Sequence, residues 1–133
     1  MKKQRLDIEY PLTTKSEHIV WEQISSPHGL ERWIADHVND EGNGRYAFTW
    51  GEPWTQQHTL TANIVKKNEN SLIRFRWTEE EDEGAYWEMR IERSELTGLL
   101  NLLITDYAWA EDLDDLRGLW DGNLERLHNY SGL

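Results

Sequence analysis

The chain has no cysteine and no long hydrophobic run. The absence of cysteine excludes disulfide bonds and thiol chemistry, and it fits the reducing cytoplasm, where we expect the protein to be located. The most apolar stretch, residues 99–104, is far too short for a membrane-spanning helix and is interrupted by Asn101. Lys2, Lys3 and Arg5 are not followed by the apolar core of a signal peptide. We therefore expect neither export nor membrane insertion.

Basic residues are also scarce. The chain has 14 lysines and arginines against 25 aspartates and glutamates, which gives a formal net charge of −11. Nucleic-acid binding needs clustered basic side chains, whereas here they are scattered along the chain. This balance argues against a nucleic-acid partner and against binding to anionic membrane surfaces.

Motifs for metal binding, nucleophilic catalysis and phosphate binding are missing as well. The five histidines are dispersed, and none has the spacing of a zinc site. The chain has no nucleophile-elbow motif and no glycine loop that would cradle a phosphate. Asp106 ends an apolar stretch, and we interpret it as a turn or helix-start residue that hydrogen-bonds nearby backbone. We therefore predict no catalytic residue, no metal site and no cofactor.

Alternation of apolar and polar residues predicts a series of antiparallel strands. Asn43 and Gly44 form the sharpest hairpin signal. The acidic residues 79–83 indicate another hairpin, whose tip we expect to be solvated. The strands are expected over residues 5–12, 36–40, 46–50, 60–64, 73–77, 87–91 and 99–107.

Two short helices are predicted after the first strand. Residues 19–24 have helical spacing, with Ser16 as the residue that caps the helix. Ser26 and Pro27 resemble an N-cap followed by proline at the first helical position, and we expect this second helix to run through Ile34.

Residues 111–133 predict a long amphipathic helix. Acidic side chains crowd its start, whereas Arg126 and His128 lie near its end, as the helix dipole favours, and Gly132 is suited to end it. Steps of three and four residues place on one face Leu113, Leu116, Trp120, Leu124 and Leu127.

These elements predict an α+β fold of the helix-grip type. The buried face of an antiparallel sheet needs a cover, and the terminal helix is the longest element available for it. A single helix cannot cover a flat sheet of this many strands, so we expect the sheet to curl around it. The length of 133 residues suggests a single domain over residues 1–133.

Several short motifs recur along nearly the whole chain in the order known from one family. They are residues 26–30, 33–36, 48–50, 73–77, 95–98, 104–106 and Trp120. In these motifs the chain resembles the START-like superfamily, which includes lipid-transfer domains, pollen allergens and a domain related to a chaperone ATPase activator. It is most similar to a group of bacterial START-like domains of unknown function. The chain departs from the pattern at Trp54, Trp87 and Trp109, which we expect to alter the shape of the pocket.

Eight tryptophans are unusual in so short a chain. Aromatic and apolar side chains on one face fit either a packed core or the wall of an apolar pocket. Together with the resemblance, they favour non-enzymatic binding of a small hydrophobic or amphipathic ligand between the sheet and the terminal helix. The predicted ligand-binding residues are Trp33, Phe48, Trp50, Phe75, Trp77, Trp87, Met89 and Trp120.

Two alternatives remain open at this point. The first is a protein-interaction or co-chaperone-like module, with a homodimer or another protein bound through the acidic surface or through Trp54 and Trp109. The second is an enzyme that uses the same cavity, which requires a titratable side chain facing inward.

Overall fold

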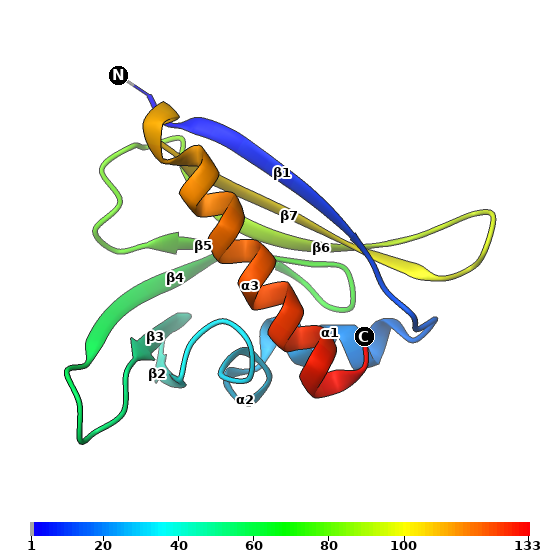
Figure 1. The fold of residues 1–133 in the computed structure, drawn as a ribbon, viewed down its shortest axis with the longest axis horizontal. Coiled ribbons are helices and arrows are strands. Elements are labelled where there is room, and N and C mark those ends of the chain that lie inside the picture. The colour runs from blue at the N-terminus through cyan, green and yellow to red at the C-terminus, as the bar shows by residue number, and fades with distance from the viewer. Residues whose placement is uncertain (1) are drawn as a thin grey trace.

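The computed structural model describes residues 2–133, and its main element is a seven-stranded antiparallel sheet (Figure 1). The strand order is β1-β7-β6-β5-β4-β3-β2, so strands two to seven form a meander and the first strand returns beside the last. The strands are β1 (Gln4–Pro11), β2 (His37–Gly42), β3 (Arg45–Trp50), β4 (His58–Asn68), β5 (Leu72–Trp77), β6 (Trp87–Arg93) and β7 (Leu100–Ala108).

The helices lie on one face of the sheet. The long helix α3 runs diagonally across that face, from the start of β1 towards α1 (Figure 1). This arrangement confirms the predicted α+β helix-grip fold, with a curled sheet around a long C-terminal helix. The helical segments are α1 (Glu17–Ser25), α2 (Pro27–Leu30), η1 (Ala110–Asp112) and α3 (Leu113–Ser131).

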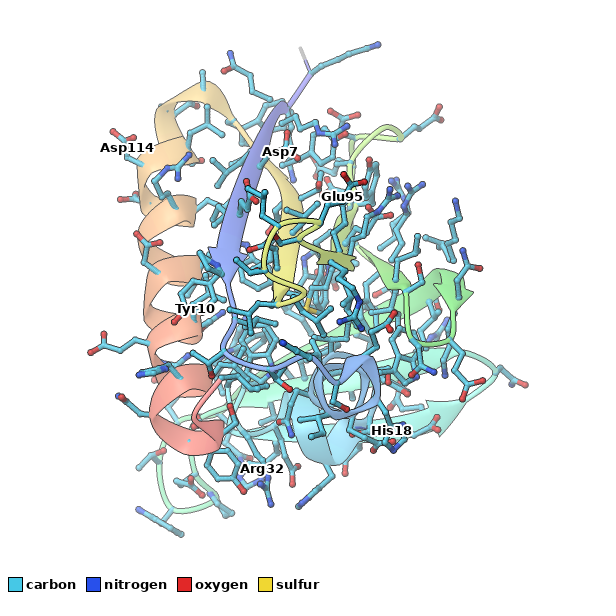
Figure 2. All side chains as sticks on the ribbon, turned by 90° about the vertical axis from the view of Figure 1, so that its right-hand side faces the viewer. Asp7, Tyr10, His18, Arg32, Glu95 and Asp114 are labelled. Carbon is cyan, nitrogen blue, oxygen red and sulfur yellow. The ribbon has the colours of Figure 1, made fainter. Side chains whose placement is uncertain are left out.

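The apolar face of α3 packs on the sheet as its spacing predicted. Trp120, Leu124 and Leu127 are buried, and the two leucines of the first turns are partly buried against the same core. Gly132 ends the helix in the left-handed conformation, with φ of 77°, and its N–H donates to the carbonyl of His128 at 2.8 Å. The acidic side of the helix faces solvent, as Asp114 does in Figure 2.

The two short helices begin where the sequence predicted. Ser16 accepts a hydrogen bond from the N–H of Ile19, and Ser26 accepts one from the N–H of Gly29. The second helix is shorter than expected, because α2 ends at Leu30 and residues 31–34 form turns. In these turns the backbone N–H groups of Arg32 and Trp33 donate to carbonyls three residues back, whereas that of Ile34 donates to the carbonyl four residues back. This change carries Trp33 into the core, where its ring is 1% exposed.

The inner face of the sheet is a cluster of aromatic rings. Phe48 lies at its centre, with ring centroids 5.5 Å from both Trp77 and Trp87. Phe75 stacks on Trp87 at 4.3 Å. Trp120 of α3 completes the cluster, 6.3 Å from Trp87. Ring pairs at these separations are favourable beyond their buried area, so the cluster fixes α3 on the sheet.

The acidic loop between β5 and β6 is not simply a solvated tip. Lys3 pairs with Glu80 at 2.7 Å, and its backbone N–H donates to Asp82 at 2.7 Å. Arg76 donates from within the sheet to carbonyls of the same loop. Lys3, directly before β1, therefore holds this loop in place together with Arg76, and the expectation of a solvated tip holds only for its exposed glutamates.

Two equally buried tryptophans allow a matched stability test. Trp33 is 1% exposed, and its Nε1 donates to the carbonyl of Gln23 in the last turn of α1 at 2.9 Å. Trp87 is 2% exposed, and its Nε1 has no hydrogen-bond partner among residues 2–133.

We expect Trp33→Phe to destabilise the protein by about 1–2 kcal/mol more than Trp87→Phe does, because only the first change leaves a carbonyl unpaired. The second change removes an unpaired donor along with part of the ring. Urea unfolding followed by circular dichroism measures both free energies of unfolding. Equal losses would contradict the assignment of these hydrogen bonds.

Candidate ligand-binding cavity

A cavity of about 330 Å³ lies between one end of the sheet and α3. In an antiparallel sheet, the ends of β3, β5 and β7 meet the starts of β4 and β6 at the same end. Residues at these strand ends supply the sheet side of the wall. The lining residues are Ile34, Trp50, His58, Leu60, Trp77, Trp87, Asp106, Leu116, Leu119, Trp120 and Asn123.

Indole rings make up much of this wall. Trp77 and Trp87 stack at 5.1 Å, while Trp50 lies 6.3 Å from Trp77 and Trp120 lies 6.3 Å from Trp87. Trp50 and Trp77 are only partly buried, so they leave ring surface free, unlike the other two. Trp50 is held in place because its Nε1 donates to the carbonyl of Ile34 at 3.1 Å.

The structure divides the eight predicted ligand-binding residues into two groups. Trp50, Trp77, Trp87 and Trp120 line the cavity. The other four do not line it and are at most 1% exposed in the core; they are Trp33, Phe48, Phe75 and Met89. Alternation places the strand residues of both groups on the inner face of the sheet, but only the position along each strand decides which of them reach the cavity.

Asp106 corrects an interpretation made from the sequence. It belongs to β7 and continues the inward alternation of Leu100, Leu102 and Ile104, so it faces the cavity. One carboxylate oxygen accepts from the N–H of Tyr107 at 2.7 Å, which is the local backbone contact that was expected. The other accepts from Nε1 of Trp120 at 2.9 Å, which joins β7 to α3.

Sequence reasoning also missed the leucines and the other polar side chains of the wall. Leu60 and Leu116 were assigned to the inner faces of their elements, but nothing singled them out as lining residues. Asn123 is buried one turn beyond Trp120, and His58 lies two residues before Leu60 on the same strand face. The orientation of both side chains towards the cavity follows from the helical and strand periods once the position of the cavity is known.

Burial raises the pKa of Asp106 from its ordinary value of 3.8 to about 6. The hydrogen bonds from Trp120 and Tyr107 favour the charged form and limit this rise. Lys3 lowers the pKa slightly, whereas Glu80 raises it. A carboxylate with a strongly shifted pKa in a cavity is typical of a functional site.

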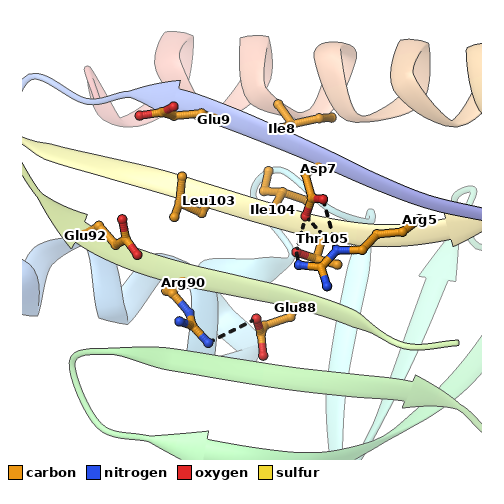
Figure 3. A pocket seen from close by; sticks show the side chains of 10 residues that line it. All are labelled: Arg5, Asp7, Ile8, Glu9, Glu88, Arg90, Glu92, Leu103, Ile104 and Thr105. Atoms are coloured by element: carbon orange, nitrogen blue, oxygen red, sulfur yellow. Dashed lines mark hydrogen bonds and ion pairs between the residues drawn. The ribbon is translucent and has the colours of Figure 1, made fainter. Parts of the chain in front are cut away.

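A second, larger hollow of about 450 Å³ lies on the opposite face of the sheet (Figure 3). Its central charges are already paired within the protein. Glu88 forms ion pairs with Arg74 at 2.9 Å and Arg90 at 3.7 Å. Arg5 pairs with Asp7 at 2.9 Å, as Figure 3 also shows. We therefore place the candidate site in the tryptophan-lined cavity.

Two kinds of site are absent from the described chain. Among residues 2–133, no three histidine or acidic side chains gather so that they could hold a metal ion. No helix within the same residues is long and apolar enough to cross a membrane.

Comparison with known proteins assigns the family. The START-like superfamily domain matches residues 1–133. The chain belongs to the START-like superfamily. Members of this superfamily commonly bind hydrophobic ligands. No curated protein matches the chain.

Solved structures with the same fold come from several bacteria. Protein BfR322 of Bacteroides fragilis is 39% identical, with 97% of this chain and 91% of that chain covered and a TM-score of 0.65. Protein CV1439 of Chromobacterium violaceum is 14% identical, with coverage of 95% and 96% and a TM-score of 0.75. The Aha1 dimer of Colwellia psychrerythraea is also 14% identical, with coverage of 96% and 93% and a TM-score of 0.67. The last two show the fold alone.

The raised pKa of Asp106 predicts how stability depends on pH. Because the folded pKa is higher than the unfolded one, protonated Asp106 stabilises the fold below about pH 4, and this contribution is lost as pH rises through about 6. Relative to wild type, Asp106→Asn should therefore gain about 2–3 kcal/mol of stability between pH 4 and pH 7.5.

Urea unfolding of both proteins at the two pH values measures this gain. Asp121→Asn is the control, since it removes an exposed carboxylate from α3 and should show a much smaller pH-dependent difference. A constant difference between wild type and Asp106→Asn would contradict burial as the cause of the shift.

Proposed function

We propose that this START-like protein binds a small apolar or amphipathic molecule in the cavity between the sheet and α3, without catalysing a reaction on it. The observation that carries the proposal is the cavity of about 330 Å³ with four indole rings in its wall. Ligand pockets generally have volumes of about 300–1,000 Å³, with mostly apolar walls and a few polar groups that orient the ligand. This cavity has both properties.

The composition of the wall supports binding rather than catalysis. Eight of the eleven lining residues are tryptophan, leucine or isoleucine. The polar ones are His58, Asp106 and Asn123. Within the described chain, no serine, threonine, tyrosine or lysine lines the cavity, so a side-chain nucleophile of these kinds is missing beside the carboxylate.

The protein-interaction alternative has weaker support. Trp54 is 81% exposed on the loop between β3 and β4. Trp109 is partly buried, with Nζ of Lys3 5.5 Å from its ring centroid. Single exposed apolar side chains are ordinary on protein surfaces and do not by themselves make an interface.

A substitution that fills the cavity tests the proposal. Leu116 lines the cavity from α3 and is partly buried, so Leu116→Trp should occupy space that the ligand needs. A neutral fluorescent probe, N-phenyl-1-naphthylamine, should bind the wild type saturably, and Leu116→Trp should weaken its binding at least tenfold.

Leu96→Trp is the matched control. Leu96 is 98% exposed on the loop between β6 and β7, so the same substitution there should leave binding unchanged. Fluorescence titration at constant temperature gives the three dissociation constants. Unsaturable binding to the wild type, or equal affinities of wild type and Leu116→Trp, would overturn the proposal.

A further inference from the structure

We propose that the ligand of this cavity is an amphipathic organic cation, an amine or quaternary ammonium compound, whose charged group lies against the indole rings beside Asp106. The inference rests on the proposed function and specifies the chemical class of the ligand. The observation that carries it is an acidic side chain and four tryptophans around one cavity, to whose wall the described part of the chain contributes neither lysine nor arginine.

The charges of the wall select against anions. Among residues 2–133, Asp106 is the single acidic lining residue, and His58 is the single basic one, with an exposed side chain. A fatty acid or a phosphate ester would meet the carboxylate with no lysine or arginine in the wall to balance it. The net charge of −11 also favours the approach of cations over anions.

Asp106 has no close basic partner within the described chain. Lys3 acts on it from a distance and is already paired with Glu80 at 2.7 Å. A buried carboxylate without a counter-charge is unfavourable, and the hydrogen bonds from Trp120 and Tyr107 compensate for this only in part. A bound cation would supply the missing charge.

The carboxylate retains room for a further hydrogen bond. Each of its two oxygens accepts one hydrogen bond from the protein, at 2.7 Å from Tyr107 and 2.9 Å from Trp120. A carboxylate has about four acceptor positions, so the N–H of a protonated amine has a free one to use. A quaternary ammonium group has no N–H and would interact with the carboxylate through its charge alone.

The rings supply the second element of cation recognition. A cation within about 6 Å of a ring centroid is attracted to the ring face, and tryptophan gives the strongest attraction. Trp120 donates to Asp106, so this ring and the carboxylate are held side by side. Trp77 and Trp50 offer partly exposed rings on the opposite, sheet side of the cavity. A cation bound beside Asp106 therefore lies next to the indole of Trp120, and the other indole rings belong to the wall of the same cavity.

The rest of the wall fits an apolar body attached to the charged group. Ile34, Leu60, Leu116 and Leu119 line the cavity, and Leu119 is 57% exposed, which places it at the rim. An alkyl or aryl group along these side chains would be removed from water. A hydrophilic cation such as a free metal ion would gain nothing from them.

The test compares four probes with the same eight-carbon chain at pH 7.5: octyltrimethylammonium, octylamine, 1-octanol and octanoate. Tryptophan fluorescence and isothermal titration calorimetry give their affinities. Both cations should bind at least tenfold more tightly than octanol, and octanoate should bind most weakly. Asp106→Asn should weaken both cations about tenfold and leave octanol within about threefold, while the control Asp121→Asn changes none of them.

A pH series adds an independent readout. Octyltrimethylammonium keeps its charge at every pH, so its affinity should fall about tenfold from pH 7.5 to pH 5 as Asp106 becomes protonated, whereas that of octanol stays constant. His58, Lys3 and Glu80 are the other titratable groups that face or act on Asp106. The same pH series on Asp106→Asn removes the contribution of the carboxylate to the affinity. Any pH dependence that remains in this variant comes from the other three groups.

Trp77→Leu tests whether the aromatic ring face contributes to cation binding beyond its apolar surface. This change keeps an apolar wall but removes one π system, so it should weaken octyltrimethylammonium severalfold more than octanol.

The outcomes distinguish the two proposals. If octanol binds and the cations bind no more tightly, or if octanoate equals them, the cation proposal fails and the proposed function stands. Unchanged cation affinity in Asp106→Asn also overturns the cation proposal. If none of the four probes binds, the cation proposal fails, and the titration with N-phenyl-1-naphthylamine decides the proposed function.

Discussion

The packing of Trp120 against the sheet is the contact on which the rest of the structure depends. Its ring lies 6.1 Å from Trp33 and 6.3 Å from Trp87, so it contacts both the segment after α2 and the inner face of the sheet. Its Nε1 also donates to Asp106 on β7. One side chain of α3 thus joins three parts of the chain that are far apart in sequence, and the position of the helix over the curled sheet follows from it.

The cavity follows from how α3 is placed and from which side chains it carries. Towards the C-terminal end of α3, Leu124 and Leu127 are buried in the core that also contains the apolar residues of α1 and α2. Nearer its start, Leu116 and Leu119 are partly exposed and leave space above the strand ends. The same amphipathic face therefore seals the core at one end and forms the wall of a pocket at the other.

Asp106 departs from the pattern of the surrounding residues. The three inward positions of β7 that precede it are apolar residues that are at most 1% exposed, namely Leu100, Leu102 and Ile104. A charged aspartate at the next position lowers the stability of the fold at neutral pH, because its carboxylate is removed from water, and an asparagine or a leucine would avoid this loss. Asp106 gains hydrogen bonds from Tyr107 and Trp120, but these offset the cost of its burial only in part. Residues kept at such a cost in stability are expected at functional sites, which is why the cavity and this carboxylate are considered together.

The sequence by itself determined most of the fold. Periods of two and of three to four residues located the strands and the face of α3, and Ser16, Ser26 and Gly132 marked helix ends. These features depend on residues that are close in sequence, so the local sequence pattern is enough to predict them. The tertiary structure alone decided that α2 stops at Leu30 and that four of the eight proposed ligand-binding residues are packed core. It also decided that Asp106 faces a cavity instead of a turn. These outcomes depend on how far along each strand α3 lies, and that distance is set by the packing of segments remote in sequence.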